Sequence, residues 1–215
     1  MTNAGLRLVS IQVGKVRSAT DWTTGIFKEA IEGPVVVGPT GIDGDEQADR
    51  VNHGGPDKAL CAYAAGHYRF WQLTFGLQML AYGAFGENVT IDGATETDVC
   101  IGDTWAVGDL LLQVSQPRQP CWKLARKWGV RDFAEQVVAS GRTGWYFRVL
   151  RGGRIEAGAA SVVVERPYPQ WTIAEANRMM YNPPPDGSEA ALAEVPLLSA
   201  SWRRTLAARR RAGRV

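Results

Sequence analysis

The chain has 215 residues, and its 24 lysines and arginines nearly balance its 22 aspartates and glutamates, for a formal net charge of +2. So small a charge argues against nucleic acid as a partner, and any electrostatic function must come from local clustering. No apolar run reaches the length of a membrane span, and the three cysteines lack the paired spacing of a disulfide framework, zinc site or iron–sulfur site. We therefore expect a protein of the reducing cytoplasm with no membrane partner.

Short extended patterns dominate the first half of the chain. Apolar stretches, some of them alternating with polar residues, lie at residues 6–16, 33–37, 59–63 and 85–91. Such stretches favour β structure, whereas the aromatic residues of segment 66–75 have helical spacing. Segment 41–57 consists largely of glycine, acidic, amide and proline residues. Long irregular loops inside a compact domain usually carry function, so this loop is a candidate site.

A hairpin-like series follows at residues 99–115, with tight turns indicated at Gly102–Asp103 and Gly108–Asp109. The pattern then continues with helices at 121–128 and 132–139 and strands at 145–150 and 160–165. Many short strands joined by turns are typical of a barrel. We predict a mainly β (α+β) fold: a closed or partly closed β-barrel with peripheral helices.

The last fifth of the chain has a helical pattern. After a boundary at residues 166–169, Thr172 and Glu175 form a capping-box signature at the start of the first of three short helices. We therefore divide the chain into a β-barrel domain, 1–166, and a small three-helix domain, 167–215. Residues 201–215 carry six arginines and no acid. This run suits either a solvated helix face or contact with an acidic partner, and the solvated face is favoured.

Cys121 is the most informative single residue. It follows a strand-ending turn in the sequence Gln-Pro-Arg-Gln-Pro-Cys-Trp-Lys and has Arg118, Lys123 and Arg126 as neighbours. Nearby cations favour the thiolate, which is the reactive and metal-binding form of cysteine. A nucleophile, a redox sensor and a metal ligand all fit this pattern, and so does a small buried apolar residue.

The glycine-rich loop provides a second candidate site. Gly54 and Gly55 let backbone amides approach a ligand closely, while Arg50, His53 and Lys58 supply donors for phosphate or another compact anion. Lys15, at the end of the first strand, adds a further cation. An ordinary structural loop has the same composition, so this hypothesis depends on what lies near the loop in the fold.

Other polar residues carry weaker signals. The acids of the loop do not have the spacing of an EF-hand, which argues against a calcium site. His53 is a better partner for Cys121 in a thiolate–imidazole pair than His67, which lies in the aromatic helical segment. Asn88, on a turn that enters a strand, provides an amide for hydrogen bonding to an organic ligand.

Five motifs in fixed order give the chain a family resemblance. They are Gly41-Ile42-Asp43-Gly44-Asp45, His53-Gly54-Gly55-Pro56-Asp57-Lys58-Ala59-Leu60, Phe85-Gly86-Glu87-Asn88, Ile101-Gly102-Asp103 and Gln116-Pro117-Arg118 with Pro120-Cys121. Together they resemble the MOSC domain family, and within it the YiiM-type branch, whose chains also end in a small three-helix domain. The resemblance covers nearly the whole chain.

The resemblance implies a β-barrel that binds molybdenum cofactor, a phosphate-bearing pterin whose dithiolene holds molybdenum. The family's cysteine corresponds to Cys121, which is then the metal ligand and catalytic residue, and thiolate suits this soft site. The residues implied to receive the pterin and its phosphate are Lys15, Arg50, His53, Gly54, Gly55, Lys58, Asn88 and Arg118. The reaction implied is reduction of N-hydroxylated compounds, such as the base analogue hydroxylaminopurine, to amines.

The source of electrons follows from what the sequence lacks. It has no GxGxxG dinucleotide fingerprint, no P-loop and no iron–sulfur cysteine set, so we expect a separate reductase to deliver electrons. A homodimer is compatible with these features. Two other hypotheses stay open: a molybdenum-cofactor or sulfur carrier with a persulfide on Cys121, and a thiol hydrolase or transferase that uses Cys121 and His53.

Overall fold

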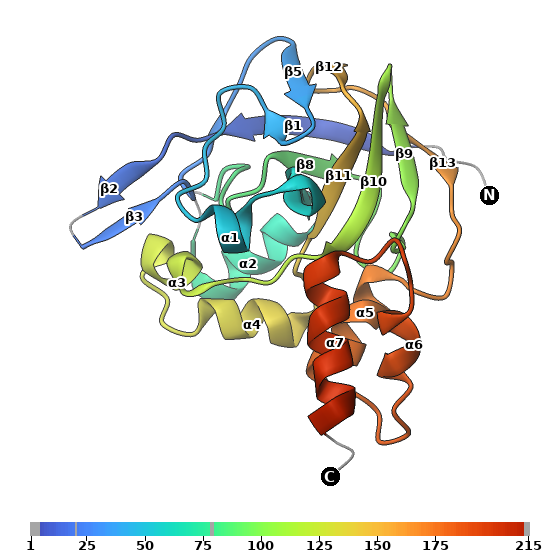
Figure 1. The fold of residues 1–215 in the computed structure, drawn as a ribbon. Coiled ribbons are helices and arrows are strands. Elements are labelled where there is room, and N and C mark those ends of the chain that lie inside the picture. Colours follow the sequence, from blue (N-terminus) through green and yellow to red (C-terminus); the bar gives the residue numbers. More distant parts are fainter. Residues whose placement is uncertain (1–4, 20, 78–79, 213–215) are drawn as a thin grey trace.

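A computed structural model describes residues 5–19, 21–77 and 80–212, with side chains at 50, 51 and 210–212 outside that description. One curled sheet forms the centre of the molecule, short helices lie against its lower end, and three C-terminal helices pack together below it (Figure 1). Within the described residues no helix combines the length and hydropathy needed to span a membrane.

The main sheet has eight strands in the order β13-β9-β10-β11-β7-β8-β1-β4. Their bounds are β1 Arg7–Val13, β4 Glu29–Ala30, β7 Leu60–Ala64, β8 Val89–Asp92, β9 Thr104–Val107, β10 Leu110–Pro117, β11 Trp145–Arg151 and β13 Val162–Glu165. All neighbours are antiparallel except β7 and β8, which run parallel. Bulges interrupt the register of β10 against β11, and bulges bend a sheet.

The sheet curls back on itself at the N-terminal end of β1. There the amide of Leu8 donates to the carbonyl of Ala159 (3.0 Å), and the amide of Ser161 donates to the carbonyl of Leu6 (2.9 Å). These bonds join the first strand to the segment that leads into β13. The result is the partly closed barrel predicted from the sequence, with large apolar side chains such as Trp105, Trp145 and Phe147 filling its interior.

Smaller sheets and helices surround the barrel. A three-stranded sheet contains β5 (Val35–Gly38), β6 (Gly41–Ile42) and β12 (Gly153–Ile155), and a two-stranded ribbon contains β2 (Arg17–Ala19) and β3 (Trp22–Thr24). The helices between the strands are α1 (Arg50–His53), the 3-10 turn Pro56–Lys58, α2 (His67–Phe75), α3 (Trp122–Trp128) and α4 (Phe133–Ser140). Helices α2, α3 and α4 share a separate apolar cluster that includes Trp71, Leu124 and Phe133.

The C-terminal helices are α5 (Ile173–Tyr181), α6 (Glu189–Ala193) and α7 (Ala200–Ala212). Thr172 caps α5 as predicted, because its hydroxyl accepts from the amide of Glu175 at 3.0 Å. Two arginines of the basic run also have structural partners. Arg209 donates to the carbonyl of Met180, and Arg203 donates to that of Ala193, so each binds the C-terminal turn of another helix, where a cation is favourable.

Two expectations about elements need correction. Residues 99–101 do not form a strand: Cys100 makes one isolated bridge to Thr172, and its amide is held by the carboxylate of Asp103 in a turn. The loop at 41–57 is also not wholly irregular, since it contains β6 and α1. The ribbon of β2 and β3 was not predicted from the sequence, because its strands have only three residues each.

Candidate functional site

A cavity lies where the glycine-rich loop, β7, the turn before β8 and the loop after β10 meet. The space between its walls, counted out into the open mouth, is about 600 Å³. Its lining side chains come from segments far apart in the sequence and include four cations. The residues that carry the chemistry discussed below are Lys28, His53, Lys58, Cys61, Asn88, Arg118, Cys121, Lys123 and Tyr146.

Cys121 lines this cavity from the start of α3. The residue is the N-cap of the helix and has extended backbone angles, but its side chain makes no capping hydrogen bond. It is half-buried, and no disulfide involves it. Cys121 is thus a free, half-buried cysteine in the wall of the cavity, and the helix that follows fixes its backbone.

Arg118 is buried in the same wall, with only 6% of its surface exposed. One guanidinium nitrogen, Nη2, donates to the carbonyl of Phe85 at 2.7 Å, whereas Nη1 has no hydrogen-bond partner. Burial favours the neutral form of Arg118, yet the neighbouring Cys61, Tyr146 and Cys121 together raise its pKa. Buried polar groups usually have hydrogen-bond partners, and an anionic ligand would accept a hydrogen bond from this remaining donor of the buried cation.

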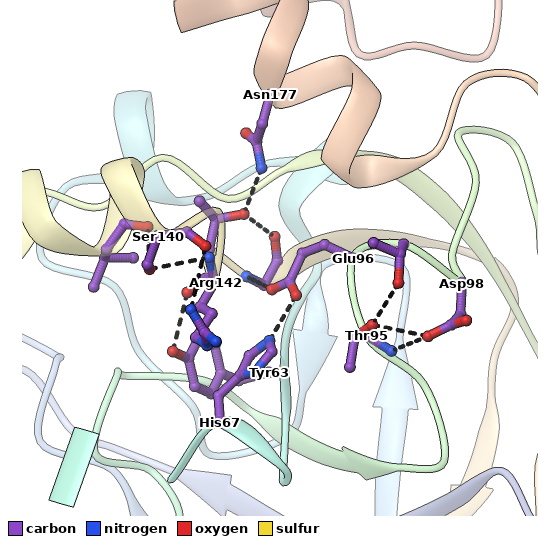
Figure 2. A network of polar contacts seen from close by, with 12 residues as sticks. Tyr63, His67, Thr95, Glu96, Asp98, Ser140, Arg142 and Asn177 are labelled. Carbon is purple, nitrogen blue, oxygen red and sulfur yellow. Dashed lines mark hydrogen bonds and ion pairs between the residues drawn. The ribbon is translucent and has the colours of Figure 1, made fainter. Parts of the chain in front are cut away.

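The backbone of Arg118 is held by a polar network that reaches the C-terminal helices. Its amide donates to the carbonyl of Gly144 at 3.0 Å, and the amide of Gly144 donates to Glu96 at 2.7 Å. Glu96 also bonds to His67 at 2.6 Å, while Asn177 of α5 donates to the hydroxyl of Thr143 at 2.8 Å (Figure 2). His67 is therefore structural, as predicted.

Gly144 is required at this point for a steric reason. Its φ is +76°, and a Cβ atom there would lie 2.3 Å from the carbonyl oxygen of Ala62. No other residue fits without moving strand β7, so the contact between this loop and Arg118 depends on the glycine.

His53 and Lys58 reach the cavity from the glycine-rich loop, as the sequence predicted. Burial, followed by the positive charge of Arg118, lowers the pKa of His53 to about 4, so its imidazole is neutral at pH 7. Burial also lowers the pKa of Lys58, whose ammonium donates to the carbonyl of Asn52 at 2.6 Å. A neutral imidazole of such low basicity is a poor base for Cys121, which disfavours the thiol hydrolase hypothesis.

Other predicted residues lie at the edge of the site or beyond it. Lys15 is exposed and pairs with Glu46 at 3.1 Å; Glu46 lines the cavity, whereas Lys15 does not. Gly54 and Gly55 are not among the lining residues, although Gly55, with a φ of +90°, begins the 3-10 turn that positions Lys58. The backbone of Arg50 begins α1, and its side chain lies outside the described part of the structure.

Asn88 lines the cavity, but its amide is engaged by the protein. Its Oδ1 accepts from the amide of Cys61 at 3.1 Å, and its Nδ2 donates to the carboxylate of Asp45 at 2.9 Å. Asp45 in turn pairs with Lys28, and both side chains are almost fully buried. Asn88 thus joins strand β7 to the glycine-rich loop, a scaffold role that the sequence did not indicate.

Two further residues that line the cavity, Cys61 and Tyr146, carry no signal in the sequence. Cys61 lies in a fully buried strand, and burial raises its pKa to about 11, so it is a neutral thiol. Tyr146 lies beside it, and burial raises the pKa of its hydroxyl far above the usual value. Both come from the pairing of β7 with β11, which is non-local. Lys123, considered only as a neighbour of Cys121, also lines the cavity.

The acids of the glycine-rich loop do not form a metal site. Within the residues that the structure describes, no group of three or more His, Cys, Asp or Glu side chains is placed to hold a metal ion. The cavity instead combines one accessible sulfur with several cations. It is suited to an anionic ligand that also offers a soft metal to Cys121.

Comparisons with known proteins match this architecture. The model of the MOSC domain family matches residues 49–162, and that of the YiiM-like 3-alpha helix domain matches residues 171–213. The crystal structure of YiiM from Geobacillus stearothermophilus superposes with a TM-score of 0.83 at 41% identity, covering 95% of this chain and 98% of that one.

Two curated relatives extend the comparison. The chain is 46% identical to the uncharacterized protein YflK of Bacillus subtilis, over 84% of this chain and 81% of that protein. It is 35% identical to a protein of Gibberella moniliformis named "Reductase", over 80% of this chain but only 32% of that longer protein.

Proposed function

Because the chain belongs to the MOSC domain family and ends in a YiiM-like three-helix domain, we propose that it reduces N-hydroxylated compounds to amines with a molybdenum cofactor. One observation carries the proposal: Cys121 and Arg118 line the same cavity, and the buried Nη1 of Arg118 has no hydrogen-bond partner. The similarity to a protein named a reductase supports the oxidoreductase class.

The residues of the cavity fit this cofactor. Thiolate is a suitable ligand for molybdenum, and Cys121 supplies the sulfur without breaking any hydrogen bond of its helix. Arg118 and Lys58 supply positive charge for the anionic pterin phosphate. The neutral imidazole of His53 offers a hydrogen bond to the pterin rather than a further charge.

The reaction consumes two electrons and two protons: R–NHOH + 2e⁻ + 2H⁺ → R–NH₂ + H₂O. When bound, the cofactor supplies the two-electron chemistry that breaks the N–O bond. Among the lining residues we assign proton delivery to Lys58, an ammonium group whose pKa is lowered by burial. His53 is unprotonated at pH 7 and is not a proton store.

Electrons must reach the cavity from outside it. The sequence carries no dinucleotide fingerprint and no cysteine set for an iron–sulfur cluster, so we propose a separate electron donor.

Turnover with an artificial reductant tests the proposed function. The protein is produced in a host that makes molybdenum cofactor and is assayed with hydroxylaminopurine and reduced methyl viologen, with amine formation as the readout. We expect the intact protein to form the amine and Cys121→Ser to lose nearly all turnover. A variant outside the cavity, Cys100→Ser, is the matched control and should stay active.

The same preparation separates the rival hypothesis. A carrier that bears a persulfide on Cys121 would release transferable sulfane sulfur to cyanide and would form no amine. Sulfane sulfur without amine formation would replace the reductase proposal with the carrier.

A further inference from the structure

A second feature combines one exposed and two half-buried aromatic rings with cations. Trp122 directly follows Cys121 and is 53% exposed. Its ring lies 5.4 Å from that of Trp22 on β3, and the Trp22 ring lies 6.1 Å from that of Phe27. We call this group, with the adjacent Arg17 and Arg126, the aromatic patch.

Cations surround the rings of the aromatic patch. The guanidinium of Arg17 lies 4.0 Å from the centre of the Phe27 ring, and that of Arg126 lies 5.7 Å from the Trp122 ring. Arg126 also pairs with Asp21, and Lys123 lies 5.9 Å from the Trp122 ring. The patch therefore has an excess of positive charge around a partly exposed apolar centre.

Basic side chains of α3 fix the position of the aromatic patch by hydrogen bonds to the backbone of residues 23 and 26. Lys123 donates to the carbonyl of Thr23 at 2.9 Å, and Lys127 donates to the carbonyl of Ile26 at 3.2 Å. These bonds hold the ribbon of β2 and β3 against the helix, which lie next to each other in Figure 1. A pre-organised surface loses little conformational entropy when a partner binds.

The aromatic patch adjoins the cavity. Thr24 and Lys123 line the cavity and also border the patch, and the patch residue Trp122 is bonded directly to Cys121. A partner seated on the patch would lie one residue from the sulfur to which we assign the metal.

We propose that the aromatic patch is the docking surface for an acidic electron-carrier protein. The inference rests on the proposed function, which requires a donor, and on charge complementarity between that donor and the cations of the patch. Tryptophan and arginine are the residues that most often dominate binding at protein interfaces, and complementary charge accelerates the encounter of redox partners. The arginines of α7 are a poorer surface, because Arg203 and Arg209 bind helix carbonyls.

Charge reversal on each surface tests this assignment, with flavodoxin, an acidic flavin protein, as the probe. Binding of flavodoxin to the purified protein is measured at low and high salt. We expect Arg17→Glu and Trp122→Ala each to weaken binding about tenfold. The matched control Arg204→Glu, an exposed arginine of α7, should leave binding within about twofold.

Turnover is measured in parallel with two reductants. Arg17→Glu should lower the rate with reduced flavodoxin but not with methyl viologen, which needs no docking surface. Absence of turnover with methyl viologen in every variant would contradict the proposed function. The binding data would still show whether flavodoxin docks on the aromatic patch.

Several results would overturn the docking proposal. They are unchanged flavodoxin binding in Arg17→Glu and Trp122→Ala, a loss of binding in Arg204→Glu, or no binding by the unaltered protein. Binding of anionic lipid vesicles or self-association through the patch, in place of flavodoxin binding, would also reject the electron carrier as its partner.

Discussion

Arg118 is a residue of the site that stability of the fold alone does not explain. Its guanidinium is buried and charged, yet one nitrogen has no partner within the protein. An incompletely paired buried charge is costly, and its replacement by an apolar side chain is often tolerated. Such a residue makes sense where an anion completes its hydrogen bonds.

Replacement of Arg118 by methionine should therefore separate binding from stability. We expect Arg118→Met to retain about ten- to a hundredfold less cofactor, since a hydrogen bond to a charged group contributes roughly 1.5–3 kcal/mol. The melting temperature of the cofactor-free protein should change little, because relief of the buried charge offsets loss of the bond to Phe85. Arg118→Lys should retain an intermediate amount. Unchanged cofactor retention in Arg118→Met would contradict the role given to Arg118.

His53 predicts a pH dependence of stability. Its pKa is about 4 in the folded protein and about 6.5 when unfolded, so the unfolded chain binds more protons between these values. Stability should fall as the pH drops from 6.5 to 4, with at most about 3 kcal/mol from this residue. Melting curves across this window should show a smaller acid loss for His53→Gln than for the unaltered protein. Parallel losses would show that His53 is not buried in its neutral form.

Among the helices and strands, short-range sequence patterns predicted those elements whose conformation depends mainly on residues close together in the chain. The alternation at residues 6–16 predicted β1, and the helix predicted at 132–139 is α4, which ends at Gly141 with a φ of +70°. The ribbon of β2 and β3 was missed because three-residue strands leave no period to detect. Its position depends on bonds from Lys123 and Lys127, about a hundred residues away in the chain.

The residues of the site also fall into two groups, those that local sequence patterns indicated and those that they did not. Cys121, His53 and Lys58 could be named as candidates because charged residues and turn residues stand next to them in the sequence, and all three line the cavity. Cys61 and Tyr146 could not, because they become neighbours only when β7 pairs with β11. Asn88 was assigned a ligand role from its residue type, but the structure shows its amide bound to Cys61 and Asp45.

Asn177 of α5 connects the C-terminal helices to the loop that holds Arg118 (Figure 2). Asn177→Ala removes a buried hydrogen bond, which contributes about 1–2 kcal/mol, so the melting temperature should fall by about 2–8 °C. Arg178→Ala, one residue along the same helix, removes only an exposed pair with Glu175 and should have little effect. An equal fall in both variants would contradict the contribution assigned to the contact with Thr143.

At the scale of the whole molecule, the barrel and the C-terminal helices share one apolar core. Trp145 of β11 and Leu112 of β10 belong to the same buried cluster as Ile173 of α5 and Trp202 of α7. Two units that bury their surfaces in a common core are expected to unfold together. We therefore predict that the barrel and the helices on either side of the division at residues 166–167, proposed from the sequence, unfold as one unit.

Thermal unfolding tests this cooperativity. Far-ultraviolet and near-ultraviolet circular dichroism should give one coincident transition for the intact chain, and a fragment of residues 1–166 should be insoluble or lack a cooperative transition. Two separate transitions, or a fragment that melts like the intact protein, would show that the helices are an independent domain.

Metal and pterin content show whether the cavity beside Cys121 holds molybdenum cofactor, as we propose. Protein purified from a host that makes the cofactor should contain close to one molybdenum and one pterin per chain. Cys100→Ser should match it, and Cys121→Ser should lose most of the molybdenum. Unaltered protein without molybdenum or pterin, or full molybdenum content in Cys121→Ser, would contradict the claim.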